Sequence, residues 1–176
     1  MVPGFDPRLA TETLNKWIAH ELAKAGREIT AAYPDGDLLV LGLLKGSFIF
    51  LSDLVRKIDR PLQVDFIVAS SYGEGTVSSG NVRLVYDPET ELEGKHILLV
   101  EDIIDTGKTL NKLVALLRQR RPMSLEICAL LHKHVAEQLE LEAKFIGLDA
   151  PTLFLVGYGL DHAENFRHLP YIASLT

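Results

Sequence analysis

The chain has 176 residues, of which 47% are hydrophobic and 24% are charged, and its formal net charge at pH 7 is −6. This length and composition predict one soluble globular domain with a sizeable core. An acidic chain lacks the basic surface that sequence-independent binding to nucleic acid requires, although a pocket can still be locally positive and bind a small anion.

The sequence also contains features that report on the cellular compartment. Its one cysteine, Cys128, lies in an apolar run and excludes an intrachain disulfide, which favours a reducing compartment. The N-terminal segment MVPGFDPRLA lacks the basic and then apolar pattern of a secretory signal. No apolar run approaches the ~18 residues of a membrane span. We therefore expect a cytoplasmic protein whose partners include neither membranes nor nucleic acids.

The predicted elements alternate between helices and apolar strands. Residues 8–32 have apolar side chains near helical spacing, and the continuous apolar run 38–44 is typical of a strand buried on both faces. This alternation predicts an α/β domain with a mainly parallel sheet and helices on both of its faces. The elements predicted after these two are a helix over 47–58, strands over 64–70, 82–86 and 95–100, a helix over 107–120, and strands over 125–131, 144–147 and 153–159.

Two turns that join a strand to a helix have features of anion-binding sites. Residues 45–47 follow the first strand, and residues 106–109 begin the helix 107–120. Each turn offers backbone N–H groups, the positive end of a helix dipole, and a glycine that lets an anion approach the backbone. In parallel sheets, ligands bind beyond the carboxyl ends of the strands. An ordinary connection without a ligand is the alternative interpretation of both turns.

Acidic residues stand directly before the second turn. Glu101 and Asp102 follow the predicted strand end, and Asp102 occupies the position where a P-loop needs its first glycine. Carboxylates there can accept hydrogen bonds from sugar hydroxyls or hold Mg²⁺. A ribose 5-phosphate satisfies both the carboxylates and the anion-binding turn, and Lys45 with Gly46 suggests a second phosphoryl group on the same ligand. A merely solvated acidic loop remains the alternative.

The stretch VEDIIDTGKTL (100–110) resembles the phosphoribosyl-pyrophosphate signature of type I phosphoribosyltransferases, and its form is similar to that of the hypoxanthine-guanine phosphoribosyltransferases. The resemblance covers roughly residues 38–172. It implies the fold of that family in a single domain, 1–176, with a core over about 38–140, a hood made from the N-terminal segment and 141–176, and a mobile loop over 71–81. Further segments that resemble the family, in its order, are LGLLKGSFIFLSDL, VDFIVASSYGEGTVSSGNVRL, ALLHK and FLVGYGLDHAENFRHLPYI.

The resemblance implies how phosphoribosyl pyrophosphate is bound. Glu101 and Asp102 would bind the ribose hydroxyls, residues 105–109 would hold the 5-phosphate, and Lys45 and Arg167 would contact the pyrophosphate. In the family, the peptide bond that corresponds to Leu44–Lys45 is often cis. The complete set implied for this ligand is Leu44, Lys45, Gly46, Glu101, Asp102, Asp105, Thr106, Gly107, Lys108, Thr109 and Arg167.

The resemblance also implies a site for the purine base and one for a metal ion. Lys133 would donate to O6 of the purine and Phe154 would stack on its ring, although by themselves they read as a solvated lysine and a core residue. The full purine-binding set is Lys133, Phe154, Leu155 and Asp161. The implied cofactor is Mg²⁺, with Glu101, Asp102 and Asp161 as its ligands. Ser71 and Tyr72 would begin a lid loop.

The implied activity is purine salvage: transfer of the 5-phosphoribosyl group to N9 of hypoxanthine or guanine, which gives IMP or GMP and pyrophosphate. Asp105 would act as general acid or base near purine N7. The resemblance further implies a homodimer or homotetramer. The alternatives are a phosphoribosyltransferase for another base, a regulator that binds the same ligand without catalysis, and a P-loop kinase. Lys133 disfavours adenine, whose amino group at C6 is itself a hydrogen-bond donor.

Overall fold

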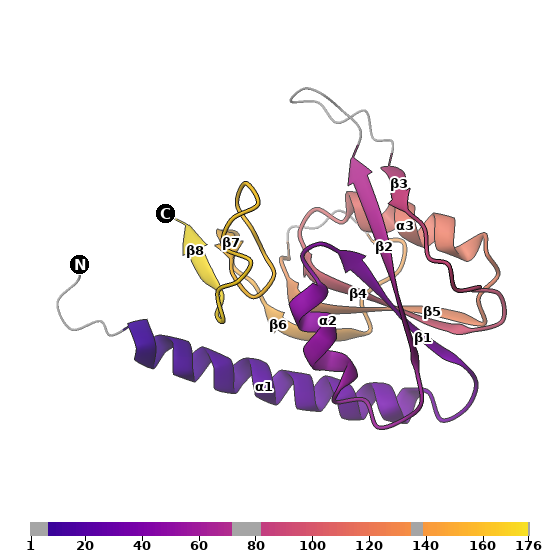
Figure 1. Cartoon of the computed structure of the whole chain (residues 1–176), viewed down its shortest axis with the longest axis horizontal. Coiled ribbons are helices and arrows are strands. Elements are labelled where there is room, and N and C mark those ends of the chain that lie inside the picture. The colour runs from indigo at the N-terminus through magenta and orange to yellow at the C-terminus, as the bar shows by residue number, and fades with distance from the viewer. Residues whose placement is uncertain (1–6, 72–81, 135–138, 176) are drawn as a thin grey trace.

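The computed structural model describes residues 7–71, 82–134 and 139–175, and Figure 1 shows how their elements are arranged. A long N-terminal helix lies along one side of a central sheet. The elements in chain order are α1 (Pro7–Ala32), β1 (Leu38–Leu44), α2 (Phe48–Val55), β2 (Gln63–Ser71), β3 (Val82–Tyr86), β4 (His96–Ile104), α3 (Lys108–Arg118), β5 (Ser124–His132), β6 (Phe145–Asp149), β7 (Phe154–Val156) and β8 (Ala173–Leu175).

The central sheet has six strands in the order β3-β2-β1-β4-β5-β6, and each neighbouring pair except β2 and β3 is parallel. This confirms the prediction of a mainly parallel sheet. From β1 the chain continues through α2 to β2 on one side, and from β4 it continues through α3 to β5 on the other side. The strands β1 and β4 therefore form a topological switch point, where such sheets bind their ligands.

Both faces of the sheet are covered by helices, as predicted. Successive side chains of a strand point to opposite faces, so each buried strand contributes to two cores. Leu38 and Leu98 belong to the core that contains residues of α1 and α2. Leu39 and Leu99 belong to the core that contains Leu113 of α3. The apolar runs are continuous because neither face of these strands meets water.

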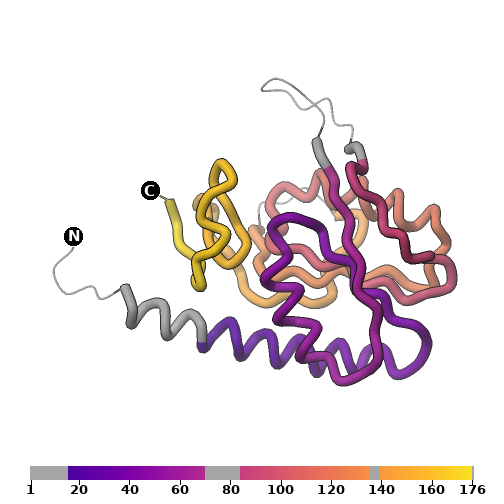
Figure 2. The backbone as a smooth tube through the Cα atoms, viewed as in Figure 1, coloured from indigo at the N-terminus to yellow at the C-terminus, as the bar shows by residue number. Residues whose placement is uncertain are grey.

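The C-terminal part of the chain forms a small hood in which β7 and β8 pair antiparallel. Tyr158 and Leu160, in the connection between these strands, share a core with Ile18 and Leu22 of α1. Figure 2 traces the hood in yellow above α1 and apart from the main sheet. The segment 141–176 that the resemblance assigns to the hood also includes β6, which pairs with β5 in the main sheet.

The strand predicted over 95–100 is longer than expected. It runs to Ile104, and its ladder with β5 continues through the pair Glu101 and Ala129. The expectation that Glu101 and Asp102 follow the end of this strand is therefore wrong. Pairing with β5 on both sides of Asp102, through Glu101 with Ala129 and Ile103 with Leu131, keeps this segment in the strand although two of its side chains are polar.

Most other predicted elements differ only at their ends, and one observed strand was not predicted. The helix predicted over 47–58 ends at Val55, and the three-residue strand β8 has no counterpart among the predicted elements. Ser71 is the last residue of β2, whereas Tyr72 and the rest of the predicted lid loop lie outside the described residues. Within the described part of the chain, no helix combines the length and apolar character that a membrane span requires.

Candidate active site

Three segments meet beyond the carboxyl ends of β1 and β4: the turn after β1, the end of β4, and a loop of the hood. Glycines allow this close approach. A Cβ atom at Gly46 would overlap the carboxylate of Asp102, and one at Gly159, where φ is +105°, would overlap the carbonyl oxygen of Gly46. Neither position therefore admits a side chain without displacement of a neighbouring segment. The peptide bond Leu44–Lys45 in this turn is cis, as the resemblance implies.

The end of β4 buries two neighbouring carboxyl groups. Oε2 of Glu101 is buried and has no hydrogen-bond partner among the described residues. Burial, and then the nearby Asp102 carboxylate, raise the pKa of Glu101 well above its usual value. Burial also raises the pKa of Asp102 to about 6, although Arg167 and backbone N–H groups partly oppose this shift. These carboxyl groups are therefore suited to a ligand that supplies hydroxyl donors or a cation.

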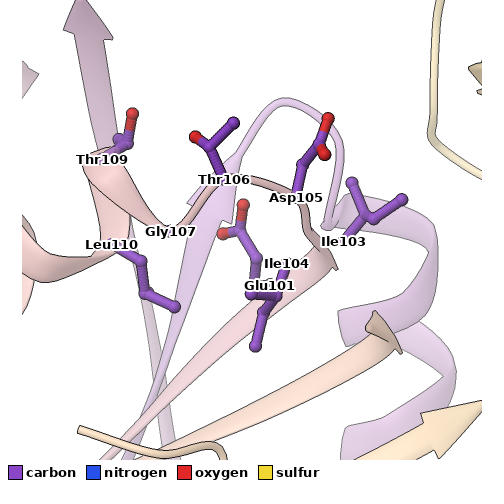
Figure 3. Close-up of a pocket in the computed structure, with 8 residues that line it drawn as sticks. All are labelled: Glu101, Ile103, Ile104, Asp105, Thr106, Gly107, Thr109 and Leu110. Carbon is purple, nitrogen blue, oxygen red and sulfur yellow. The ribbon is translucent and has the colours of Figure 1, made fainter. Parts of the chain in front are cut away.

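A pocket of about 170 Å³ lies between the end of β4 and the start of α3. Figure 3 shows the Glu101 carboxylate beneath the loop of Thr106 and Gly107, whereas Asp105 points away from that loop. Gly107 precedes α3 with φ +78°, in the left-handed region that favours glycine. The loop therefore presents the first N–H groups of a helix to an anion. The pocket is lined by Glu101, Ile103, Ile104, Asp105, Thr106, Gly107, Thr109 and Leu110.

Lys133, the first residue after β5, contacts Asp105 directly. Its backbone N–H donates to the carbonyl oxygen of Ile104 at 2.9 Å, which fixes it beside the end of β4. Its Nζ donates to Oδ2 of Asp105 at 3.3 Å. Lys133 is only 8% exposed, whereas the Asp105 side chain is 54% exposed. The lysine expected to bind the base and the aspartate expected to perform chemistry are thus neighbours.

Arg167 and Lys45, the two cations expected to contact pyrophosphate, also come together. Arg167 donates through Nη1 to the carbonyl oxygen of Gly159 at 2.9 Å, and its Nη2 lies 2.8 Å from Oδ1 of Asp161. The same Nη2 lies 3.4 Å from Oε2 of Glu164, and Nζ of Lys45 lies 3.1 Å from that oxygen. The hood loop, which is the connection between β7 and β8, therefore carries Arg167 and positions Glu164 beside Lys45.

Phe154 is an exposed aromatic residue of the hood. It begins β7, is 52% exposed, and packs edge-to-face against His162 with ring centroids 5.4 Å apart. Its neighbour Leu155 is half-buried. An accessible ring in this position can stack on a planar base. The assignments of Phe154 and Leu155 to purine binding stay predictions, as do the other ligand contacts implied by the resemblance.

The structure thus brings together Lys45 and Gly46 after β1, Asp102 at the end of β4, and Asp161 and Arg167 of the hood, and it adds one residue that the sequence did not single out. Glu164 contacts Lys45 although the two are 119 residues apart in the chain. No local pattern in the sequence predicts such a pair. Its only signal is its place within the polar segment that leads to Arg167.

Comparisons with known proteins show the family to which the chain belongs. The family model of the phosphoribosyl transferase domain matches residues 11–163. The chain is 46% identical over 158 residues to a hypoxanthine-guanine phosphoribosyltransferase of Bacillus subtilis, covering 90% of this chain and 88% of that protein. It is 44% identical over 160 residues to a hypoxanthine phosphoribosyltransferase of Escherichia coli, covering 90% of each. A crystal structure of a hypoxanthine phosphoribosyltransferase from Staphylococcus aureus matches with a TM-score of 0.87 at 41% identity, covering 92% of this chain and 88% of that one. The chain therefore belongs to the phosphoribosyl transferase domain family.

Proposed function

We propose that this protein is a purine salvage enzyme, a hypoxanthine-guanine phosphoribosyltransferase. It transfers the 5-phosphoribosyl group of phosphoribosyl pyrophosphate to N9 of hypoxanthine or guanine and releases pyrophosphate. The observation that carries the proposal is the contact between Lys133 and Asp105, directly beside the anion-binding loop at the start of α3. This contact supports the proposal because it brings the proposed donor to a 6-oxo group beside the proposed proton-transfer group, next to the proposed phosphate site.

The proposed ribose 5-phosphate site lies at the pocket between β4 and α3. The 5-phosphate accepts hydrogen bonds from the backbone N–H groups and hydroxyls of residues 105–109, and the helix dipole adds to this attraction. The carboxyl groups of Glu101 and Asp102 accept hydrogen bonds from the ribose hydroxyls. Their raised pKa values support this role, because buried carboxyl groups gain from donors that replace lost water.

Mg²⁺ is the proposed cofactor, held by Asp102, Asp161 and Glu101 together with oxygens of the substrate. The buried and unpaired Oε2 of Glu101 and the buried Asp102 carboxylate fit this hard cation. Among the described residues no three His, Cys, Asp or Glu side chains are grouped to hold a metal by themselves. Mg²⁺ commonly relies on one or two carboxylates, waters and substrate phosphates, so the substrate would complete this site. When bound, Mg²⁺ supplies positive charge to the leaving pyrophosphate.

In the proposed mechanism the base and the leaving group are handled by separate residues. Lys133 donates to O6 of the purine and orients N9 toward C1 of the ribose. Asp105 accepts or holds the proton at N7 while N9 attacks, a role for which its half-exposed side chain is accessible. Lys45 and Arg167 stabilise the charge that develops on pyrophosphate as the ribose becomes an oxocarbenium-like species.

The proposal is tested by pyrophosphate release in the presence of phosphoribosyl pyrophosphate, Mg²⁺ and one purine at a time. We expect release with hypoxanthine and guanine. We expect little release with adenine, because its C6 amino group and the Lys133 ammonium are both donors. Xanthine shares the 6-oxo group, so its rate measures selection at C2. Absence of release with all of these bases would overturn the proposal.

We further propose that the protein acts in the cytoplasm as a homodimer or homotetramer. The buried thiol of Cys128 supports a reducing compartment, since the chain contains no second cysteine with which to form a disulfide. Light scattering of the purified protein measures the oligomeric state. A monomer at micromolar concentration would contradict this part of the proposal.

A further inference from the structure

The Glu164 carboxylate lies where the proposed pyrophosphate site has its two cations. Its Oε2 accepts a hydrogen bond from Nζ of Lys45 at 3.1 Å and lies 3.4 Å from Nη2 of Arg167. Both contacts converge on the same oxygen atom. Hydrogen bonding by Lys45 and the charge of Arg167 lower the pKa of Glu164, so this group is an anion at neutral pH. A side-chain anion thus already makes the contacts that a phosphate oxygen of the ligand would make.

The backbone around Glu164 is held in a conformation that few residues adopt. His162 and Asn165 pair as a two-residue turn, with N–H to O distances of 3.2 and 3.0 Å. The two central residues, Ala163 and Glu164, have φ of +50° and +65°. Such turns strongly prefer Asn and Gly at these positions. In addition, the Glu164 N–H donates to Oδ2 of Asp161 at 2.8 Å, which helps to hold the backbone of this turn in place.

Glu164 and Asp161, the two acids that contact Arg167, differ in how exposed their side chains are. The side chains of Glu164 and Lys45 are 65% and 63% exposed. Those of Asp161 and Arg167 are only 28% and 19% exposed. An exposed carboxylate can leave its partners for water at little cost, whereas the more enclosed pair is held in place. Arg167 also retains a buried Nε without a hydrogen-bond partner among the described residues, so it can serve a further acceptor.

We propose that Glu164 is an internal counter-ion of the pyrophosphate subsite, displaced when phosphoribosyl pyrophosphate binds and restored when pyrophosphate leaves. This inference rests on the proposed function, because it assigns a competing group to the same site. Glu164 keeps Lys45 and Arg167 together in the free protein. It also lowers the affinity for phosphoribosyl pyrophosphate, since the phosphoryl oxygens must replace existing ion pairs when the ligand binds. It is therefore a positioning residue that sets the Michaelis constant for phosphoribosyl pyrophosphate and favours product release.

The test compares the Glu164→Gln variant with the wild type and with Glu93→Gln. Gln keeps the size of the side chain and removes its charge. Glu93 offers a matched control, because its Oε2 pairs with Nη2 of Arg121 at 2.9 Å and its side chain is 51% exposed. It precedes β4, so the length of this strand, roughly 30 Å, separates it from the site. Calorimetric titration with inorganic pyrophosphate measures binding, and steady-state kinetics with phosphoribosyl pyrophosphate measures turnover.

We expect Glu164→Gln to bind pyrophosphate about three- to tenfold more tightly and to lower the Michaelis constant for phosphoribosyl pyrophosphate similarly, as the loss of weak exposed ion pairs predicts. Glu93→Gln should behave as the wild type in both assays. Tighter binding cannot arise from damage to the fold. Unchanged or weaker pyrophosphate binding by Glu164→Gln, or equal tightening by Glu93→Gln, overturns the inference. If the wild type binds pyrophosphate but shows no transferase activity, the proposed function fails, and the titration still tests Glu164 as a competing anion.

Discussion

Replacement of Asp105 by Asn separates catalysis from binding and from stability. The substitution keeps the shape of the side chain but removes its ability to accept a proton. General acid–base catalysis contributes about 10²–10⁴-fold, so kcat should fall by this factor, or about 3–5 kcal/mol of transition-state stabilisation. The Michaelis constant for phosphoribosyl pyrophosphate should change much less, because the backbone of residues 105–109 is the proposed phosphate ligand.

The structure predicts that this variant remains folded. The Asp105 side chain is 54% exposed and its contact with Lys133 is 3.3 Å long, so the lost ion pair is worth at most about 1 kcal/mol. For a domain of this size, that corresponds to a decrease in Tm of about 2–4 °C. Asp87→Asn is a matched control, because Asp87 pairs with Arg120 at 2.7 Å and its side chain is 50% exposed.

Steady-state kinetics and thermal unfolding of wild type, Asp105→Asn and Asp87→Asn provide the measurement. We expect a large loss of kcat in the Asp105 variant alone and small changes of Tm in both variants. An intact kcat with an increased Michaelis constant for phosphoribosyl pyrophosphate would refute the acid–base role and make Asp105 a binding residue. A loss of Tm well above 4 °C would refute the reasoning about its exposed ion pair.

Three further predictions follow from the site and its supports. Gly159→Ala should lower the free energy of unfolding by about 1–3 kcal/mol and raise the Michaelis constant for phosphoribosyl pyrophosphate, because the added Cβ overlaps the Gly46 carbonyl. An unchanged Tm would contradict this prediction. Burial raises the pKa of Asp65, but hydrogen-bond donors such as Thr90 outweigh burial, so the pKa is lowered overall. The ionised Asp65 therefore stabilises the folded state above the unfolded pKa of 3.8, and this stabilisation is lost as the pH falls below that value. Asp65→Asn should therefore destabilise the protein at pH 7 and lose less stability than the wild type on acidification, as denaturant titrations from pH 7 to 3 would show. Excess chelator should abolish pyrophosphate release, Mg²⁺ should restore it, and full activity in chelator would exclude a required divalent cation.

The strands of the sheet were predicted well because the pattern that indicates a strand lies within the strand itself. A continuous apolar run such as 38–44 indicates a strand buried on both faces, and both of its faces are indeed covered. The end of β4 was predicted incorrectly because Glu101 and Asp102 are polar, whereas the pairing that carries the strand past them, of Glu101 with Ala129 and of Ile103 with Leu131, comes from β5. The short β8 depends on pairing with β7 across the hood, and three residues carry no periodic pattern.

The candidate site was predictable where a segment has its own signature and not where contacts join distant segments. Residues 101–109 combine carboxylates with an anion-binding turn, so their ligand class follows from their types and spacing. The contacts of Lys133 with Asp105 and of Glu164 with Lys45 depend on how strand ends and the hood loop meet in space. Only the folded chain shows that each of these cations already has an acidic partner.

The most direct test of the central claim identifies the product. Protein, Mg²⁺, phosphoribosyl pyrophosphate and hypoxanthine are incubated, and the nucleotide is measured by mass spectrometry and NMR beside the released pyrophosphate. We expect equal amounts of pyrophosphate and of a nucleotide joined through N9, and a strong decrease of both with Asp105→Asn. Release of pyrophosphate without a nucleotide, or formation of a nucleotide joined through another nitrogen, would contradict the account.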